Sequence, residues 1–150
     1  MEKNELIQII DNLLTPIGFK RKGNSWVING AEVNRIINLQ KSQHSNSFYI
    51  NYGYILKSLP LNGFVNHISN RLGSEDKIEQ NRITELLNLS NEIERKNRVE
   101  ELTVIIKEKI INKIQFVETE SDVLEVLENM KYLYTIPPFV LEHFNISIKW

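Results

Sequence analysis

The stretch NRIINLQKSQHSNSFYINYGYIL, residues 34–56, decides the fold, because two runs of alternating apolar and polar residues flank one short polar segment. Successive side chains of a β-strand point to opposite faces, so this alternation predicts two strands that are each apolar on one face. We place these strands at residues 32–42 and 47–56. Since only a few residues separate them, the two strands should form an antiparallel hairpin.

The register of this hairpin follows from a four-residue loop at residues 43–46. Such a loop makes Ser42 face Ser47, and it makes Leu39 face Ile50 on a mostly apolar face. A slip by one residue would move every apolar side chain to the other face, so the pattern selects this register. The opposite face is mostly polar and carries Asn38, Gln40, Tyr49 and Asn51.

A further strand is expected before the hairpin, at residues 25–28. It is followed by Asn29-Gly30, a dipeptide typical of the two-residue type I′ turn, because both positions of that turn need positive φ. This turn makes Trp26 face Val33 and places Trp26 on the apolar face of the sheet. Trp26 is therefore expected in the core.

The remaining elements are mainly helical. Apolar residues spaced by three and four predict helices at residues 4–14 and 98–114, and Ser121 is expected to cap a third helix. Weaker patterns predict a strand at 64–68 that ends at 71–73, partial helix within 74–97, a short helical turn at 138–144 and an extended end at 145–150. Strands followed by helices predict one α+β domain over residues 1–150. It has an N-terminal helix, a three- to four-stranded antiparallel sheet, and C-terminal helices packed on one sheet face.

The composition restricts the classes of function. The formal net charge of -1 argues against a general nucleic-acid binder, which needs a large basic surface to neutralise phosphates. The absence of cysteine excludes disulfides, thiolate metal sites and cysteine nucleophiles. We see no apolar run long enough for a membrane span and no signal peptide, so the cytoplasm is the expected location.

Catalytic and cofactor motifs are missing from the sequence. There is no glycine-rich phosphate loop and no Gly-x-Ser-x-Gly motif, and His44, His67 and His143 are far apart in sequence. No cofactor and no metal ion is implied by these patterns. The acidic residues at 118–128 lie near an expected helix start, where carboxylates favour the helix dipole. They also form a surface suited to a basic partner.

Lys20-Arg21-Lys22 is the densest basic cluster and has two interpretations. Three adjacent cations can bind the phosphates of a nucleic-acid backbone. They are also typical of an edge strand, where charge discourages pairing with other chains.

The polar face of the hairpin is the candidate binding surface. Asn38, Gln40, Asn51 and Tyr49 offer adaptable hydrogen bonds but no acid or base at neutral pH, and Arg71 on the next strand is placed to join them. Such a patch suits recognition better than catalysis. The other interpretations are a solvated sheet face or a face covered by helices with its amides paired. We add Lys41 as a residue able to hold an anion together with Arg71.

Four short motifs carry a family resemblance. They are GFKRKGNSW (residues 18–26), INLQKS (37–42), FYINYG (48–53) and RLG (71–73), in this order. Over about residues 4–73 the chain resembles the bacterial domain of unknown function family 4304. The resemblance implies a small bacterial α+β domain and points to Trp26, Gln40, Lys41, Asn51 and Arg71, but it implies no activity.

These observations favour a non-enzymatic, cytoplasmic binding domain with a protein partner, of the kind that neutralises a toxin as an immunity protein. The alternatives are an enzyme that handles a small molecule or nucleotide in an anion pocket, and an RNA-binding module that uses residues 20–22. A deep pocket joining Gln40, Lys41 and Arg71 would favour the enzyme, and a flat sheet face would favour the binding domain. The oligomeric state is left open.

Overall fold

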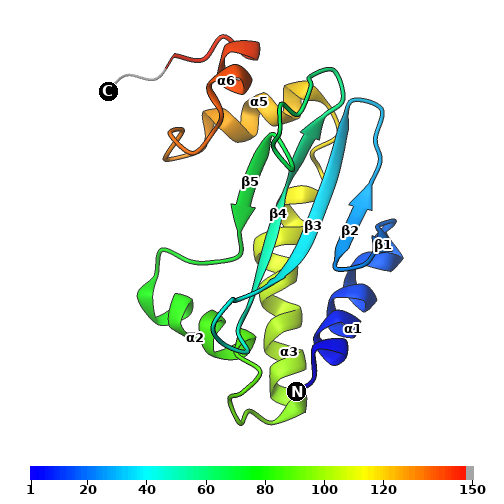
Figure 1. The fold of residues 1–150 in the computed structure, drawn as a ribbon, viewed down its shortest axis with the longest axis vertical. Helices are drawn as coiled ribbons and strands as arrows, with labels where there is room; N and C mark the ends of the chain where they lie inside the picture. Colours follow the sequence, from blue (N-terminus) through cyan, green and yellow to red (C-terminus); the bar gives the residue numbers. More distant parts are fainter. Residues whose placement is uncertain (148–150) are drawn as a thin grey trace.

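The computed structural model describes residues 1–147 and shows a five-stranded antiparallel sheet with its strands in chain order (Figure 1). The prediction of three to four strands is therefore one or two strands short. The additional strand is the basic cluster, which forms one edge of the sheet, as the edge-strand interpretation expected. The strands are β1 (Lys20–Lys22), β2 (Ser25–Ile28), β3 (Val33–Lys41), β4 (Phe48–Leu56) and β5 (Ile68–Arg71).

The predicted register of the central hairpin is confirmed. Leu39 pairs with Ile50 and Asn38 pairs with Asn51 across β3 and β4. At the loop, Ser42 N donates to Ser47 O over 2.8 Å. The alternation of apolar and polar residues along the two strands therefore determines which side chains face the core.

The predicted type I′ turn at Asn29-Gly30 is wrong. Neither residue has positive φ, and Trp26 pairs with Ile37 instead of Val33. The connection is held instead by Asn34, whose Oδ1 accepts from Gly30 N, and by Lys57, whose Nζ donates to Gly30 O. Because the register differs from the predicted one by four residues, an even number, Trp26 keeps its face and is fully buried.

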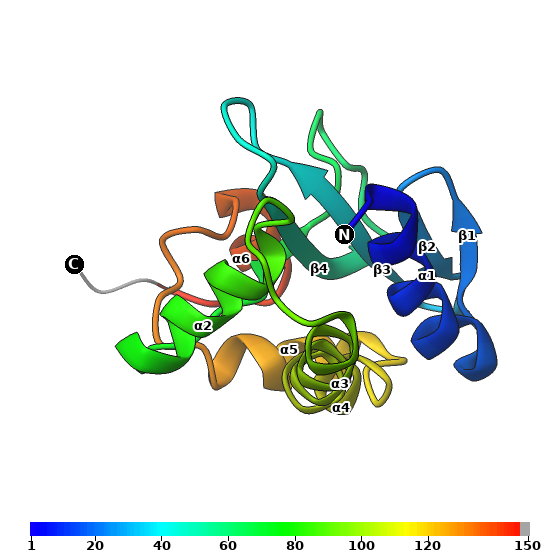
Figure 2. The same ribbon diagram turned by 90° about the horizontal axis from the view of Figure 1, so that it is seen from below.

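The helices lie on one side of the sheet, with α3 crossing behind its centre and α1 beside it (Figures 1 and 2). Those predicted at 4–14 and 98–114 are confirmed, the second starting three residues early and containing a π-helical turn at Lys107–Ile111. The helices are α1 (Lys3–Leu14), α2 (Lys77–Leu87), α3 (Arg95–Ile106), α4 (Asn112–Ile114), α5 (Glu120–Glu128) and α6 (Pro138–His143), and a 3₁₀ turn, Thr15–Ile17, follows α1.

Two predicted boundaries are wrong. The cap of α5 is Thr119 and not Ser121, because Thr119 forms a capping box with Asp122. The strand predicted at 64–68 lies instead at 68–71. Before it, the chain leaves the sheet in a loop fixed by the buried His67, whose Nδ1 accepts from Leu56 N over 2.8 Å. The extended end predicted at 145–150 falls partly on 148–150, outside the described residues.

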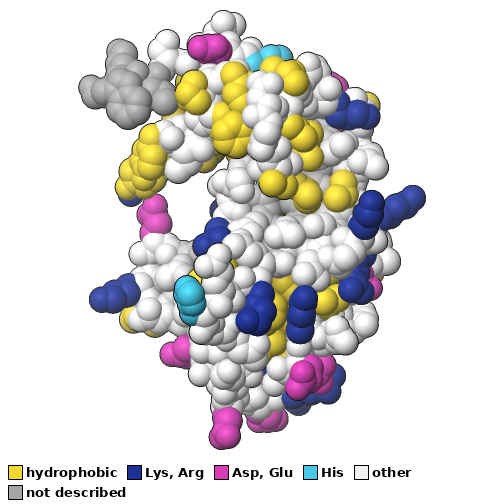
Figure 3. Space-filling view, in the orientation of Figure 1, with side chains coloured by type: hydrophobic (Ala, Val, Ile, Leu, Met, Phe, Trp, Pro, Cys, Tyr) yellow, Lys and Arg dark blue, Asp and Glu magenta, His cyan; other side chains and the backbone are white. Residues whose placement is uncertain are grey.

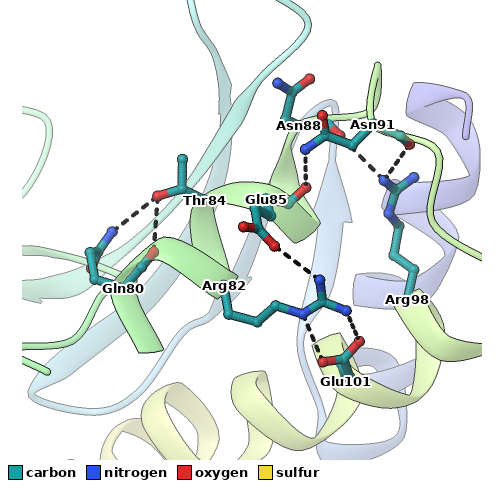
Figure 4. Close-up of polar contacts among 8 residues, drawn as sticks. All are labelled: Gln80, Arg82, Thr84, Glu85, Asn88, Asn91, Arg98 and Glu101. Atoms are coloured by element: carbon teal, nitrogen blue, oxygen red, sulfur yellow. Dashed lines mark hydrogen bonds and ion pairs between the residues drawn. The ribbon is translucent and has the colours of Figure 1, made fainter. Parts of the chain in front are cut away.

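Two buried arginines tie the helices to the rest of the fold. Arg98 is 1% exposed and donates through Nη2 to the carbonyl oxygens of Asn88 and Asn91, just after α2 (Figure 4). Arg35, which projects from β3, donates to the carbonyl oxygens of Ile114 and Gln115 at the end of α4. Both arginines therefore link carbonyl oxygens at or after a helix end to another part of the fold, in addition to the backbone hydrogen bonds that three of these oxygens accept.

Candidate functional site

A row of polar side chains crosses the sheet on the face that the helices leave uncovered. The strand pairing aligns one residue from each strand, in the order Lys22, Ser25, Asn38, Asn51 and Arg71. We call these five residues the polar row. Because neighbouring strands are about 4.8 Å apart, the row is about 19 Å long, with a cation at each end.

Arg71 joins two amides and an aromatic ring at one end of the polar row. Its Nε donates to Asn51 Oδ1 over 3.0 Å, and its Nη2 donates to Gln40 Oε1 over 3.1 Å. Asn51 Nδ2 also donates to Gln40 Oε1 over 2.9 Å. The guanidinium lies 4.0 Å from the centroid of the Tyr49 ring. The prediction that Arg71 joins this patch is therefore confirmed.

The remaining predicted site residues divide between the two faces. Asn38 belongs to the polar row, where its Nδ2 donates to Ser25 Oγ over 3.1 Å. Lys41 pairs with Phe48 in the register of the apolar face, and its Nζ donates to the carbonyl oxygens of Ser42 and Ser45 in the hairpin loop. The structure thus brings Gln40, Tyr49, Asn51 and Arg71 together and leaves Lys41 outside that group.

The electrostatic character of the open face is positive. None of the five strands contains an aspartate or glutamate, whereas Lys20, Lys22 and Arg71 all belong to the open face in the register of the sheet. Figure 3, which looks onto this face, shows lysine and arginine side chains across its middle and carboxylates mainly towards its edges. The face therefore suits an anionic partner, although the whole chain carries a net charge of -1.

The loop between β4 and β5 rises over part of the open face, on the side away from the helices (Figure 2). Together with the sheet it encloses a cavity of about 250 Å³, lined by Asn38, Gln40 and Asn51 below and by Val65 and Asn66 of the loop. Gly53 permits this close approach, since a Cβ there would lie 2.0 Å from Ile68 O. The lining contains amides but no carboxylate, histidine, lysine or arginine, so it offers recognition without a general acid or base that works near neutral pH.

A second cavity, of about 440 Å³, lies on the helical side of the sheet, and none of the residues of the predicted binding surface lines it. It is bordered by β4, β5, α4 and α5 and contains the side chains of Tyr52 and Tyr54. Burial raises the pKa of both phenols; for Tyr54 the neighbouring Tyr52 raises it further and Arg35 opposes the rise. Both hydroxyls therefore stay protonated and able to donate at physiological pH.

The histidines and acidic residues serve local structure. His67 lies under the β4–β5 loop, His143 contacts Glu120, and His44 lies in the hairpin loop. Within residues 1–147, no three His, Asp or Glu side chains are placed to hold one metal ion. Over the same residues no helix has the length and apolar character needed to cross a membrane.

Together the fold and site define an α+β domain with one helical face and one open, polar sheet face. The chain belongs to the family described as a domain of unknown function, DUF4304, whose model matches residues 10–129. The match extends the resemblance seen in the N-terminal motifs through α5, and it includes every residue of the polar row. No curated protein and no solved structure matches the chain significantly.

Proposed function

We propose that this chain is a non-enzymatic, cytoplasmic domain that binds a protein partner through the polar row and the adjoining Gln40 and Tyr49. The observation that carries the proposal is the Arg71 network, which holds two amides, a guanidinium and an aromatic ring on an uncovered sheet. Arginine and tyrosine are enriched among residues that dominate binding energy at protein interfaces. The preformed hydrogen bonds reduce the entropy lost when a partner orders these side chains.

The charge of the open face selects the chemistry of the partner. Two of its cations, Lys22 and Arg71, lie at the two ends of the polar row, with no carboxylate on the strands between them. A protein surface with acidic side chains near both ends and hydrogen-bonding groups between them would complement the row. A toxin with such a surface is the partner that we propose, so that binding blocks its action in the manner of an immunity protein.

The arrangement gives less support to an enzyme with an anion pocket. That hypothesis requires Gln40, Lys41 and Arg71 in one deep pocket, but Lys41 binds the hairpin loop instead. No side chain of the Arg71 network is a general base or an activated nucleophile at neutral pH. A recognition role uses every member of this network, whereas a catalytic role uses none of them as acid or base.

Capture from a lysate of the source organism tests the proposal. The bait is the wild-type chain, compared with a variant carrying Gln40→Ala, Asn51→Ala and Arg71→Ala and with a control carrying Lys96→Ala on the exposed side of α3. A protein retained by the wild type and the control, but not by the triple variant, supports the proposal. Retention of RNA in its place, sensitive to salt, would favour the RNA-binding alternative. If nothing is retained by the wild type at micromolar concentration, the proposal fails.

A further inference from the structure

We infer that the cavity of about 440 Å³ between the sheet and α4–α5 binds an uncharged heteroaromatic small molecule of about the size of a nucleoside. The cavity lies on the opposite side of the sheet from the polar row. The inference is therefore independent of the proposed protein partner. Its volume falls within the range of cavities that bind small molecules, about 300–1,000 Å³.

Two buried phenols are the first observation behind this inference. Tyr54 is 1% exposed and Tyr52 is 8% exposed, and both line the cavity. Within the described residues, neither hydroxyl forms a hydrogen bond, and neither hydroxyl oxygen is fully buried although the two rings are. The two hydroxyls are therefore available to a molecule in the cavity.

The helical wall supplies the second observation. The π-helical turn at Lys107–Ile111 interrupts the long helix immediately before Asn112 and Lys113, which both line the cavity. A π-turn inserts a residue into an α-helix and so rotates the residues that follow it; such turns occur frequently at functional sites. The irregular turn is followed directly by the two polar side chains that α4 contributes to the cavity.

The lining indicates the chemistry of the ligand. Three amides, from Asn70, Asn112 and Asn129, provide donors and acceptors in addition to the two phenols. A heterocycle with adjacent donors and acceptors on its edge matches such a set, because each amide can both give and accept a hydrogen bond. The apolar part of the lining, which contacts the faces of a ring, is Phe116, Val117, Val126 and Met130.

Charge argues against an anionic ligand such as a nucleotide. The ionisable side chains of the lining are Lys113, Asp122 and Glu125, so carboxylates outnumber cations. Asp122 accepts hydrogen bonds from Glu118 N and Thr119 N, which hold its pKa below the ordinary value and keep it ionised. A phosphate in the cavity would lie among like charges.

The cavity is accessible to a ligand from the edge of the sheet. Figure 3 shows the surface hollowed beside β5, between the β5–α2 connection and the segment after α5. Asn70 lies on β5 and Asn129 directly follows α5, so residues of the lining lie on two elements that border the hollow. An ion pair of 3.6 Å between Lys131 Nζ and Glu75 Oε1 links its two sides.

Titration with adenosine, cytidine, uridine and inosine, followed by ligand-observed and amide NMR, tests the inference. At least one nucleoside is expected to bind and to shift the amide signals of Asn70 and Asn112. Tyr52→Phe combined with Tyr54→Phe should weaken binding about tenfold or more, since each lost hydroxyl removes one hydrogen bond to the ligand. The double variant should fold normally, because neither hydroxyl forms a hydrogen bond with any of residues 1–147.

The controls separate this cavity from other surfaces. Tyr132→Phe, at an exposed tyrosine outside the cavity, and Arg71→Ala, on the open sheet face, should both leave the nucleoside affinity unchanged. The inference is overturned if no nucleoside binds the wild type at millimolar concentration. It is also overturned if the double phenylalanine variant binds as well as the wild type, or if the 5′-monophosphate binds more tightly than its nucleoside.

Discussion

The guanidinium of Arg71 lies 4.0 Å from the centroid of the Tyr49 ring while two of its nitrogens donate to Asn51 and Gln40. These three contacts hold the arginine side chain in one orientation although it is exposed. A cation held over the face of an aromatic ring at an exposed site contributes about 0.5–1 kcal/mol. The arrangement preorganises a cationic group on the open face of the sheet.

A double-mutant cycle tests this coupling. Arg71→Ala and Tyr49→Leu should each lower the free energy of unfolding by about 1 kcal/mol or less, because both side chains are partly solvated. Together they should show a coupling energy of about 0.5–1 kcal/mol, measured by urea unfolding of the four proteins. Strictly additive effects would show that the two side chains do not interact in solution.

Loss of a buried arginine should be far more costly. Arg98→Ala removes the guanidinium that donates to the carbonyl oxygens of Asn88 and Asn91, and it leaves a cavity where this fully buried side chain lay. We expect a loss of about 2–4 kcal/mol in the free energy of unfolding, measured by denaturant titration. The matched control is Arg95→Ala on the same helix, where an exposed ion pair with Glu5 contributes about 0–1 kcal/mol. Equal losses in the two variants would contradict the capping role of Arg98.

Gly53 tests how closely the chain leading into β5 passes over β4. Gly53→Ala places a methyl group 2.0 Å from Ile68 O, which forces β4 and β5 apart. Such overpacking should cost about 1–3 kcal/mol of unfolding free energy. Ser69→Ala, at the residue paired with Gly53, should change stability by less than about 0.5 kcal/mol. If Gly53→Ala is as stable as the wild type, Ile68 O does not pass as close to residue 53 as the structure indicates.

The cap of α5 should make part of the stability depend on pH. The backbone groups of Glu118 and Thr119 donate to Asp122 and lower its pKa from the ordinary value of 3.8. A carboxyl group whose pKa is lower in the folded than in the unfolded protein stabilises the fold. This stabilisation is complete above the pKa of the unfolded state, and it is lost as the pH falls through the pKa of the folded state. Asp122→Asn should therefore lower the melting temperature at pH 7, and the difference from wild type should shrink below about pH 4. A difference that is constant from pH 7 to pH 2 would contradict this.

The sequence predicted the parts of the fold that depend on alternation. The β3–β4 register, the apolar face and the burial of Trp26 all follow from side chains that alternate between core and solvent. The Asn29-Gly30 turn was predicted wrongly, because tertiary contacts of Asn34 and Lys57 override the local preference of the dipeptide. The position of β5 was missed because His67, far from any periodic pattern, fixes the chain before it.

The candidate sites were predictable to different degrees. Alternation placed Gln40, Tyr49 and Asn51 on one face, and the pairing of β4 with β5 then added Arg71. Alternation did not indicate the second cavity. The lining of that cavity comes from β4, β5, α4 and α5 and depends on how the helices cover the sheet. The π-helical turn before Asn112 has no recognisable sequence signal in this chain.

The central claim is that the open sheet face binds an acidic protein partner, and calorimetric titration of the captured partner tests it most directly. The account predicts that Arg71→Ala weakens binding about tenfold or more, as expected for a residue that dominates an interface. It also predicts that Lys96→Ala binds like the wild type. Equal affinity of Arg71→Ala and wild-type protein for this partner would contradict the account.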